Sequence, residues 1–300
     1  MYPPSYVVPI IRSLSSLPKL KNVTIFVVST QETDQDQLPP LRCFRNLVSL
    51  SISYSLDLPR AYCDQEIVPA IAASPELTRF SLNNRCEFER GETRASLQSL
   101  LGKSRPGLMQ LKLDRVSVPT AVFTQIISCK LQELSVTTPP GSRDLDFHWA
   151  KLWLMLKEVG VELSTLSVKG SEKAMDDMFD YLVSYTGLRK LKIRGIQMDR
   201  QDLEDSAGYM LWNQILPHHK DTLTELVIAP CYKGVWCYGP AATETILQCS
   251  SLRKLTLSVC SVDSSWAKAK LLRERKNNNV KFYNLCEPYG MEENCGVCTM

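Results

Sequence analysis

The chain has 300 residues, 44% of them hydrophobic, so it is long enough to bury a sizeable core in one large domain or two ordinary ones. Its 35 basic and 32 acidic side chains leave a formal charge of +3, which supplies no general electrostatic basis for binding nucleic acid or an anionic membrane. No apolar run reaches the roughly 18 to 20 residues of a membrane span. We therefore expect no nucleic-acid partner and no membrane partner.

Eleven cysteines are present, and most are single residues inside apolar segments, such as Cys129 and Cys249. The first residues have no basic region ahead of the apolar ones and carry an early proline pair, which is unlike a secretory signal. We therefore expect reduced thiols that pack as small hydrophobes in a cytoplasmic or nuclear protein.

A six-residue frame, Leu-x-x-Leu-x-Leu with substitutions, recurs along the whole chain, and each copy predicts one β-strand with alternating buried aliphatics. A weaker tenth copy has Val280 and Phe282 in the aliphatic positions. Consecutive clear copies lie 23 to 35 residues apart. The nine clear copies begin at Leu20, Leu47, Leu77, Leu108, Leu131, Leu163, Leu188, Leu223 and Leu252.

Between the frames, apolar residues recur at helical spacing. The predicted helices lie, in chain order, in 70–76, 93–104, 119–129, 148–160, 175–185, 209–216 and 242–250. Strands that alternate with helices predict a parallel sheet, and units that cannot bury their apolar faces alone stack into a solenoid. We therefore predict an α/β leucine-rich-repeat solenoid of nine or ten irregular repeats, with a curved parallel sheet on the concave face and helices on the convex face.

This solenoid is expected to form a single domain over 1–285, followed by a flexible tail over 286–300. The tail contains the pair Cys295 and Cys298, with Cys286 nearby. Zinc needs four ligands and this stretch offers three. Two interpretations stay open: incidental thiols on a flexible end, or a terminal disulfide or metal clip.

The frames, their spacing and the stretch CSSLRKLTLSVC (249–260) resemble the repeat portion of fungal F-box-like proteins, over roughly Leu14 to Leu285. The resemblance implies a substrate-recognition role in a ubiquitin ligase, where an F-box segment docks on a Skp1-type adaptor. Only 19 residues precede Leu20, and Leu17-Pro18-Lys19-Leu20 lacks the acidic residue of an F-box signature. We therefore expect Skp1-type adaptor binding only if an F-box lies upstream.

No pattern of enzymatic chemistry emerges. Gly102-Lys103-Ser104 ends like a phosphate-binding loop, but that motif needs Gly at the position of Leu97. The three histidines are too few and too scattered for a metal site; His218 and His219 follow Pro217 at a predicted helix end, where a cation suits the helix dipole. We expect no enzyme activity, no cofactor and no metal.

Alternate frame positions are expected to point away from the core onto the open face of the sheet. Most are small and hydroxylic, but Lys169, Lys190, Lys192 and Arg194 (the basic cluster) gather four cations on two adjacent strands. Like charges this close repel unless something neutralises them. The cluster is either a docking patch for an acidic or phosphorylated segment, or it is balanced by neighbours such as Glu133 and Glu225.

The loop after the eighth predicted strand contains Tyr232, Trp236 and Tyr238 among Gly and Pro. Exposed aromatics are typical anchors of protein interfaces. These three are candidate partner-binding residues, with the alternative that they fold back over the end of the solenoid. Phe147 and Trp149 are expected on the core face of the following helix.

Together these features predict a non-enzymatic protein-interaction module that binds a protein or peptide on the concave face or on the loops at the C-terminal strand edge. The family resemblance favours the substrate-recognition part of an F-box-type ubiquitin-ligase adaptor. The alternative is a stand-alone scaffold or inhibitor without a link to ubiquitin ligases.

Overall fold

The structure, a computed structural model, describes residues 7–27, 38–54, 62–84, 107–115, 130–137, 146–169, 175–195, 201–230, 235–237, 239–259, 279–284 and 297–298. The chain forms two compact units, residues 1–139 and 140–300, where the sequence predicts one domain over 1–285. No helix in the described ranges is both long and apolar enough to cross a bilayer.

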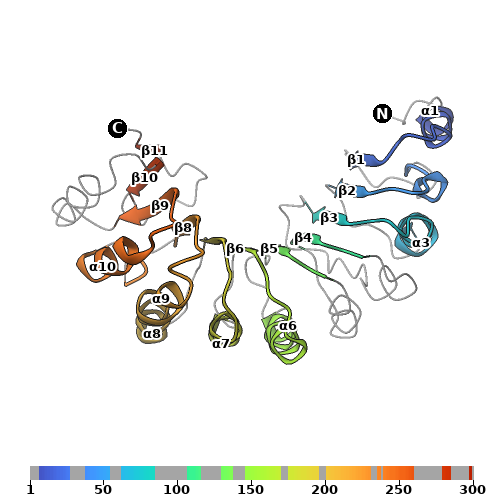
Figure 1. The fold of residues 1–300 in the computed structure, drawn as a ribbon. Coiled ribbons are helices and arrows are strands. Elements are labelled where there is room, and N and C mark those ends of the chain that lie inside the picture. Colours follow the sequence, from blue (N-terminus) through green and yellow to red (C-terminus); the bar gives the residue numbers. More distant parts are fainter. Residues whose placement is uncertain are drawn as a thin grey trace. The chain divides into compact units, whose positions relative to one another are not determined.

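The first unit is a parallel sheet whose strands follow one another in chain order. Its strands are β1 (Asn22–Val27), β2 (Ser49–Tyr54), β3 (Arg79–Asn84), β4 (Gln110–Asp114) and β5 (Glu133–Thr137). Its described helical segments are α1 (Val7–Ser15), the 3-10 turn η2 (Leu41–Cys43), the π-helix η3 (Cys63–Ile67) and α3 (Val68–Ala72). Figure 1 shows α1 and α3 on the same side of this sheet.

The second unit repeats the arrangement and closes with one antiparallel strand. Parallel strands β6 (Thr165–Lys169), β7 (Lys190–Arg194), β8 (Glu225–Ala229), β9 (Lys254–Val259) and β10 (Asn279–Asn284) pair in order, and β11 (Val297–Cys298) pairs antiparallel with β10. The helices are α6 (Asp146–Val159), α7 (Met175–Val183), α8 (Gln201–Met210), the π-helix η4 (Leu211–Ile215), α9 (Leu216–His218) and α10 (Pro240–Gln248). They lie on one face of the sheet (Figure 1). The opposite face, which no described helix covers, is called the outward face.

The frame accounts for the strands. Each strand from β1 to β9 begins two residues after the first Leu of a copy, and β10 coincides with the tenth, weaker copy. At β6, Leu166 and Val168 of the strand and Leu163 just before it are buried, whereas Thr165 and Ser167 are half-buried. Alternation along a strand places the aliphatics against the helices and the polar residues on the outward face.

A shared carbonyl joins each strand to the next from β1 to β5 and from β6 to β9. The Ser164 carbonyl oxygen accepts the N–H groups of both Arg189 (2.8 Å) and Lys190 (3.0 Å). The Arg189 carbonyl oxygen does the same for Thr224 (2.7 Å) and Glu225 (3.0 Å), and the first unit repeats the arrangement at β1, β2 and β3. Backbone groups at the start of each strand are thereby satisfied by the preceding repeat.

Aromatic side chains fill much of the helix layer in the second unit. Trp153 of α6 stacks on Tyr181 of α7 with ring centroids 6.0 Å apart, and Tyr181 packs on Tyr185 at 5.0 Å. Tyr185 in turn lies 5.4 Å from the ring of His219, just after α9. Since such rings each bury a large apolar area, this row contributes much of the stability of the unit.

The two adjacent histidines bind carbonyls of the preceding repeat. Nε2 of His219 lies 2.9 Å from the Leu182 carbonyl oxygen in the last turn of α7, and Nε2 of His218 lies 3.0 Å from that of Tyr185 just beyond it. Because a carbonyl only accepts, each ring N–H donates. Burial lowers the pKa of His219 to about 4, against the opposing effect of the Leu182 bond. His219 is therefore neutral at pH 7, which corrects the expectation of a cation at this helix end.

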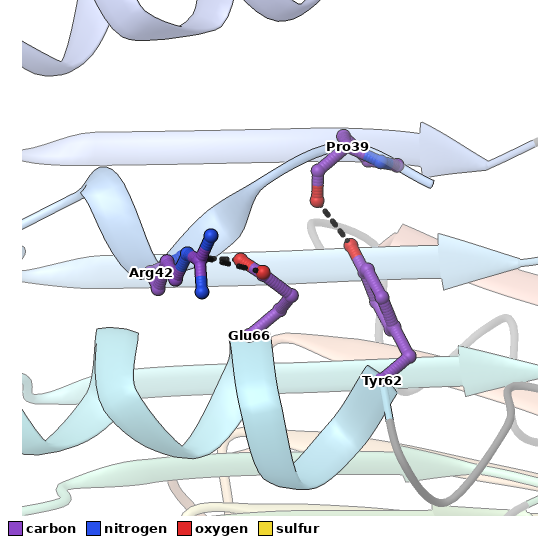
Figure 2. A network of polar contacts seen from close by, with 4 residues as sticks. All are labelled: Pro39, Arg42, Tyr62 and Glu66. Carbon is purple, nitrogen blue, oxygen red and sulfur yellow. Dashed lines mark hydrogen bonds and ion pairs between the residues drawn. The ribbon is translucent and has the colours of Figure 1, made fainter. Parts of the chain in front are cut away.

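A polar network ties η3 of the first unit to the segment before β2 (Figure 2). Glu66 accepts the backbone N–H of Arg42 at 2.9 Å and lies 3.4 Å from the guanidinium Nε of the same residue. At the start of the helix, the Tyr62 hydroxyl donates to the Pro39 carbonyl oxygen at 2.7 Å. Two residues of one helix thus hold both ends of a turn more than twenty residues earlier in the chain.

The predicted α/β fold of parallel strands that follow chain order, with connecting helices, is confirmed within each unit. The leucine-rich-repeat class and the count of repeats stay predictions. Predicted helices in 93–104 and 119–129 lie outside the described residues, as do Cys286 and Cys295. In the segment predicted as a flexible tail, Val297 and Cys298 form β11.

Candidate functional site

The basic cluster occupies the outward face of two neighbouring strands in the second unit. Lys169 of β6 is the register partner of Arg194 of β7, and Lys190 and Lys192 precede Arg194 on β7 at alternate positions. Lys169, Lys190 and Arg194 are exposed, and Lys192 is half-buried. The structure therefore brings the four predicted cations together on one surface.

A fifth cation belongs to the same surface and was missed in the sequence. Lys254 of β9 is the register partner of Glu225 of β8, and Glu225 is in turn the register partner of Lys190 of β7. Lys254 holds the same frame position as Lys190, so the repeat frame carries the signal that places it there.

Glu225 holds two of these cations. Its Oε1 lies 3.0 Å from Nζ of Lys192 and 2.9 Å from Nζ of Lys254. One carboxylate oxygen therefore forms an ion pair with both ammonium groups. Burial on its own would raise the pKa of Glu225, but Lys254 and Lys192 outweigh it and hold the pKa below its usual value.

The other cations differ in their surroundings. In the described part of the chain, Lys190 and Arg194 form no ion pair or hydrogen bond through their side chains. The neutralisation considered in the sequence therefore holds for Lys192, through Glu225. It does not extend to Lys190, although Glu225 is its register partner.

Outward positions of β8 and β9 are more enclosed than the alternation predicts. Val227 is 1% exposed, Thr256 is 5% exposed and Ser258 is also buried. A partner can therefore reach the basic cluster on β6 and β7, and the Lys254 ammonium beside it, but not these three side chains.

Trp236 does not form part of an accessible site. It is fully buried, and its ring lies 5.9 Å from that of Phe179 in α7. The indole N–H of Trp212 donates to the Val235 carbonyl oxygen at 2.7 Å, which holds this stretch of loop against η4. The prediction that Trp236 contacts a partner is wrong, because residues 235–237 pack against α7 and η4; the alternative, that the aromatics cover the end of the solenoid, stays untested. Tyr232 and Tyr238 lie outside the described residues.

Glycine allows this close approach of the loop. A Cβ on Gly208 of α8 would lie 3.0 Å from Cγ1 of Val235 and 3.2 Å from the backbone nitrogen of Trp236. Trp149, predicted on a core face, is buried at the start of α6.

The described cysteines and potential metal ligands form no reactive cluster. Burial raises the pKa of Cys63 to about 12, so this thiol stays protonated and is a poor nucleophile. The described cysteines Cys43, Cys63, Cys237 and Cys249 are free thiols, and no group of three potential metal ligands occurs within the ranges that the structure covers. What the outward face offers is a set of ammonium and guanidinium groups that suit an anion.

A scan against models of protein families found no match for this chain, and a search of curated proteins found none either.

Proposed function

We propose that this protein is a non-enzymatic module that binds a protein partner through the outward face of β6 and β7. The observation that carries this proposal is the basic cluster, in which exposed Lys190 and Arg194 have no acidic partner among the described residues. Neighbouring side chains on adjacent strands lie about 5 Å apart, where like charges destabilise a sheet. A surface that keeps such a cluster is suited to a partner that neutralises it.

A protein partner fits this surface better than a nucleic acid. The net charge of the chain is only +3, and five cations with one carboxylate among them offer few phosphate contacts. Sheet positions on a repeat fold present a broad, rigid array of side chains, which suits an extended segment of another protein.

The proposal is tested by affinity capture with a charge-reversed variant. We expect Lys190→Glu with Arg194→Glu to lose the partners that the wild-type chain captures from its own cells, because both side chains are exposed and the change reverses the charge of the surface. The variant should still fold cooperatively, since both side chains are exposed and neither forms an ion pair or a hydrogen bond among the described residues; thermal unfolding checks this.

The matched control is Lys112→Glu with Lys130→Glu, which makes the same charge change at exposed positions of the first unit. It should keep every partner of the wild type. Partners that survive the β7 change, or that the control loses equally, would show that the basic cluster is not the docking surface.

The link to ubiquitin ligases rests on the resemblance to F-box-like proteins. If the protein is the recognition part of such an adaptor, the full-length gene product should co-purify with a Skp1-type adaptor whether or not the basic cluster is intact. Its absence from the captured material would favour the alternative, a stand-alone scaffold or inhibitor.

A further inference from the structure

One carboxylate stands among the cations of the outward face. Glu225 lies between Lys190 and Lys254 in the register of β7, β8 and β9, yet its Oε1 contacts Lys192 and Lys254. Its side chain is 12% exposed, whereas those of Lys192 and Lys254 are 27% and 49% exposed. An anion that belongs to the chain thus already occupies the inner part of the cationic surface.

The outward cations of β7 follow the period of an extended chain. Lys190, Lys192 and Arg194 occupy alternate positions of β7, and Glu225 holds only the middle one, Lys192. Alternate residues of a strand lie roughly 7 Å apart, so Lys190 and Arg194 lie roughly 14 Å apart. An extended peptide with carboxylates at every second position presents one charge to each of the three cations, so it can match this row without a special turn.

We propose, on the basis of the protein-binding function argued above, that the docking segment is an extended, carboxylate-rich peptide and that Glu225 limits its affinity by holding Lys192 and Lys254. The Glu225 carboxylate is fixed by the fold, so it competes with ligand carboxylates without the entropy loss that a free ligand bears. Its charge also repels an acidic segment. Removing that charge should therefore strengthen binding, opposite in sign to removing a cation.

The experiment measures fluorescence anisotropy of a labelled short peptide that alternates Glu and Ser, at low salt, with the full chain. Glu225→Gln keeps the shape of the side chain and removes its charge. We expect it to bind the probe about threefold to tenfold more tightly than wild type, as expected for one or two exposed ion pairs gained. Lys190→Gln with Arg194→Gln should weaken binding by a similar factor.

Two further variants keep the test sharp. Glu225→Asp retains the charge and should bind the probe no more tightly than wild type. If Glu225→Gln alone fails to fold, Glu225→Gln in a Lys254→Gln background removes the like-charge repulsion of the freed lysines. That double variant should still bind more tightly than Lys254→Gln alone, because it releases Lys192 to the probe.

Weaker binding by Glu225→Gln, in both backgrounds, would overturn the role given to Glu225, because it would mean that the carboxylate positions the lysines for the ligand. If the affinity for the probe is unchanged by Lys190→Gln with Arg194→Gln, the proposal of an acidic docking segment is wrong. Partner capture by the wild-type chain could still succeed in that case. A single-stranded RNA oligonucleotide that binds more tightly than the peptide, with the same variant dependence, would replace the protein ligand with a nucleic acid.

Discussion

At the scale of single residues, His219 shows how burial decides what an ionisable side chain does. A histidine beside a helix end suits the dipole when charged, and the sequence alone favours that interpretation. In the structure the ring is buried, donates to the Leu182 carbonyl oxygen and packs at a tilt beside Tyr185. Transfer of an imidazolium into this setting is unfavourable, so the fold selects the neutral ring.

This selection makes stability depend on pH. The pKa of His219 is about 4 in the fold and near its ordinary value of 6.5 when unfolded, so the unfolded chain binds the proton more readily. The free energy of unfolding is therefore highest above about pH 6.5 and falls as the pH drops towards 4. At pH near 5 it is lower by about 2 kcal/mol than at neutral pH.

We expect urea denaturation to show this loss in wild type and not in His219→Gln, whose amide can still donate to the carbonyl. His218→Gln serves as the comparison: it removes the smallest of the three effects on the pKa of His219 and leaves the burial of that ring, so it should keep most of the wild-type dependence on pH. Parallel profiles for wild type and His219→Gln would contradict the buried neutral ring.

At the scale of elements, both units place a π-helix just before a proline. Segment η3 is followed by Val68-Pro69, and η4 is followed by Leu216-Pro217. Proline lacks the N–H of an α-helical bond and its ring crowds the carbonyl four residues earlier, so a wider turn accommodates it. The helix predicted over 209–216 includes η4, but hydrophobic spacing does not distinguish the wider turn, and the helix predicted over 70–76 begins after η3.

The contacts of Glu66 with Arg42, which join η3 to the segment before β2, can be tested by substitution. Glu66→Ala removes the acceptor of the Arg42 N–H and should lower the free energy of unfolding by about 1 kcal/mol. Glu66→Gln keeps an oxygen for that bond and loses only an ion pair with a largely exposed guanidinium, so its cost should be about half a kcal/mol or less. Equal losses in chemical denaturation would mean that the charge, and not the backbone bond, holds η3 to the turn.

At the scale of the whole molecule, what could be predicted from the sequence is what repeats. Leu163, Leu166 and Val168 show their burial through alternation, and the same frame locates every strand from β1 to β10. Features that depend on a single contact could not be found this way. The burial of Trp236 depends on its meeting Phe179, and the pairing of Glu225 depends on which of several nearby lysines reaches it.

The burial of Trp236, which depends on a single contact and not on the repeat, can be tested directly. Trp236→Ala should lower the free energy of unfolding by about 3 to 5 kcal/mol, because it leaves a large cavity beside Phe179. Trp236→Phe should cost clearly less. An unfolding midpoint unchanged by the alanine variant would restore Trp236 as a surface residue available to partners.

The carbonyl that accepts two N–H groups at the start of successive strands affects which insertions and deletions the protein can tolerate in evolution. Every complete repeat brings both the oxygen that its successor needs and the donors that its predecessor needs. Duplication or loss of one whole repeat inside a unit therefore leaves the backbone hydrogen bonds of the other repeats intact. Insertion of half a repeat instead leaves N–H donors unpaired on one side and a carbonyl acceptor unpaired on the other. Length can vary in steps of one repeat while the surface chemistry of each step changes independently.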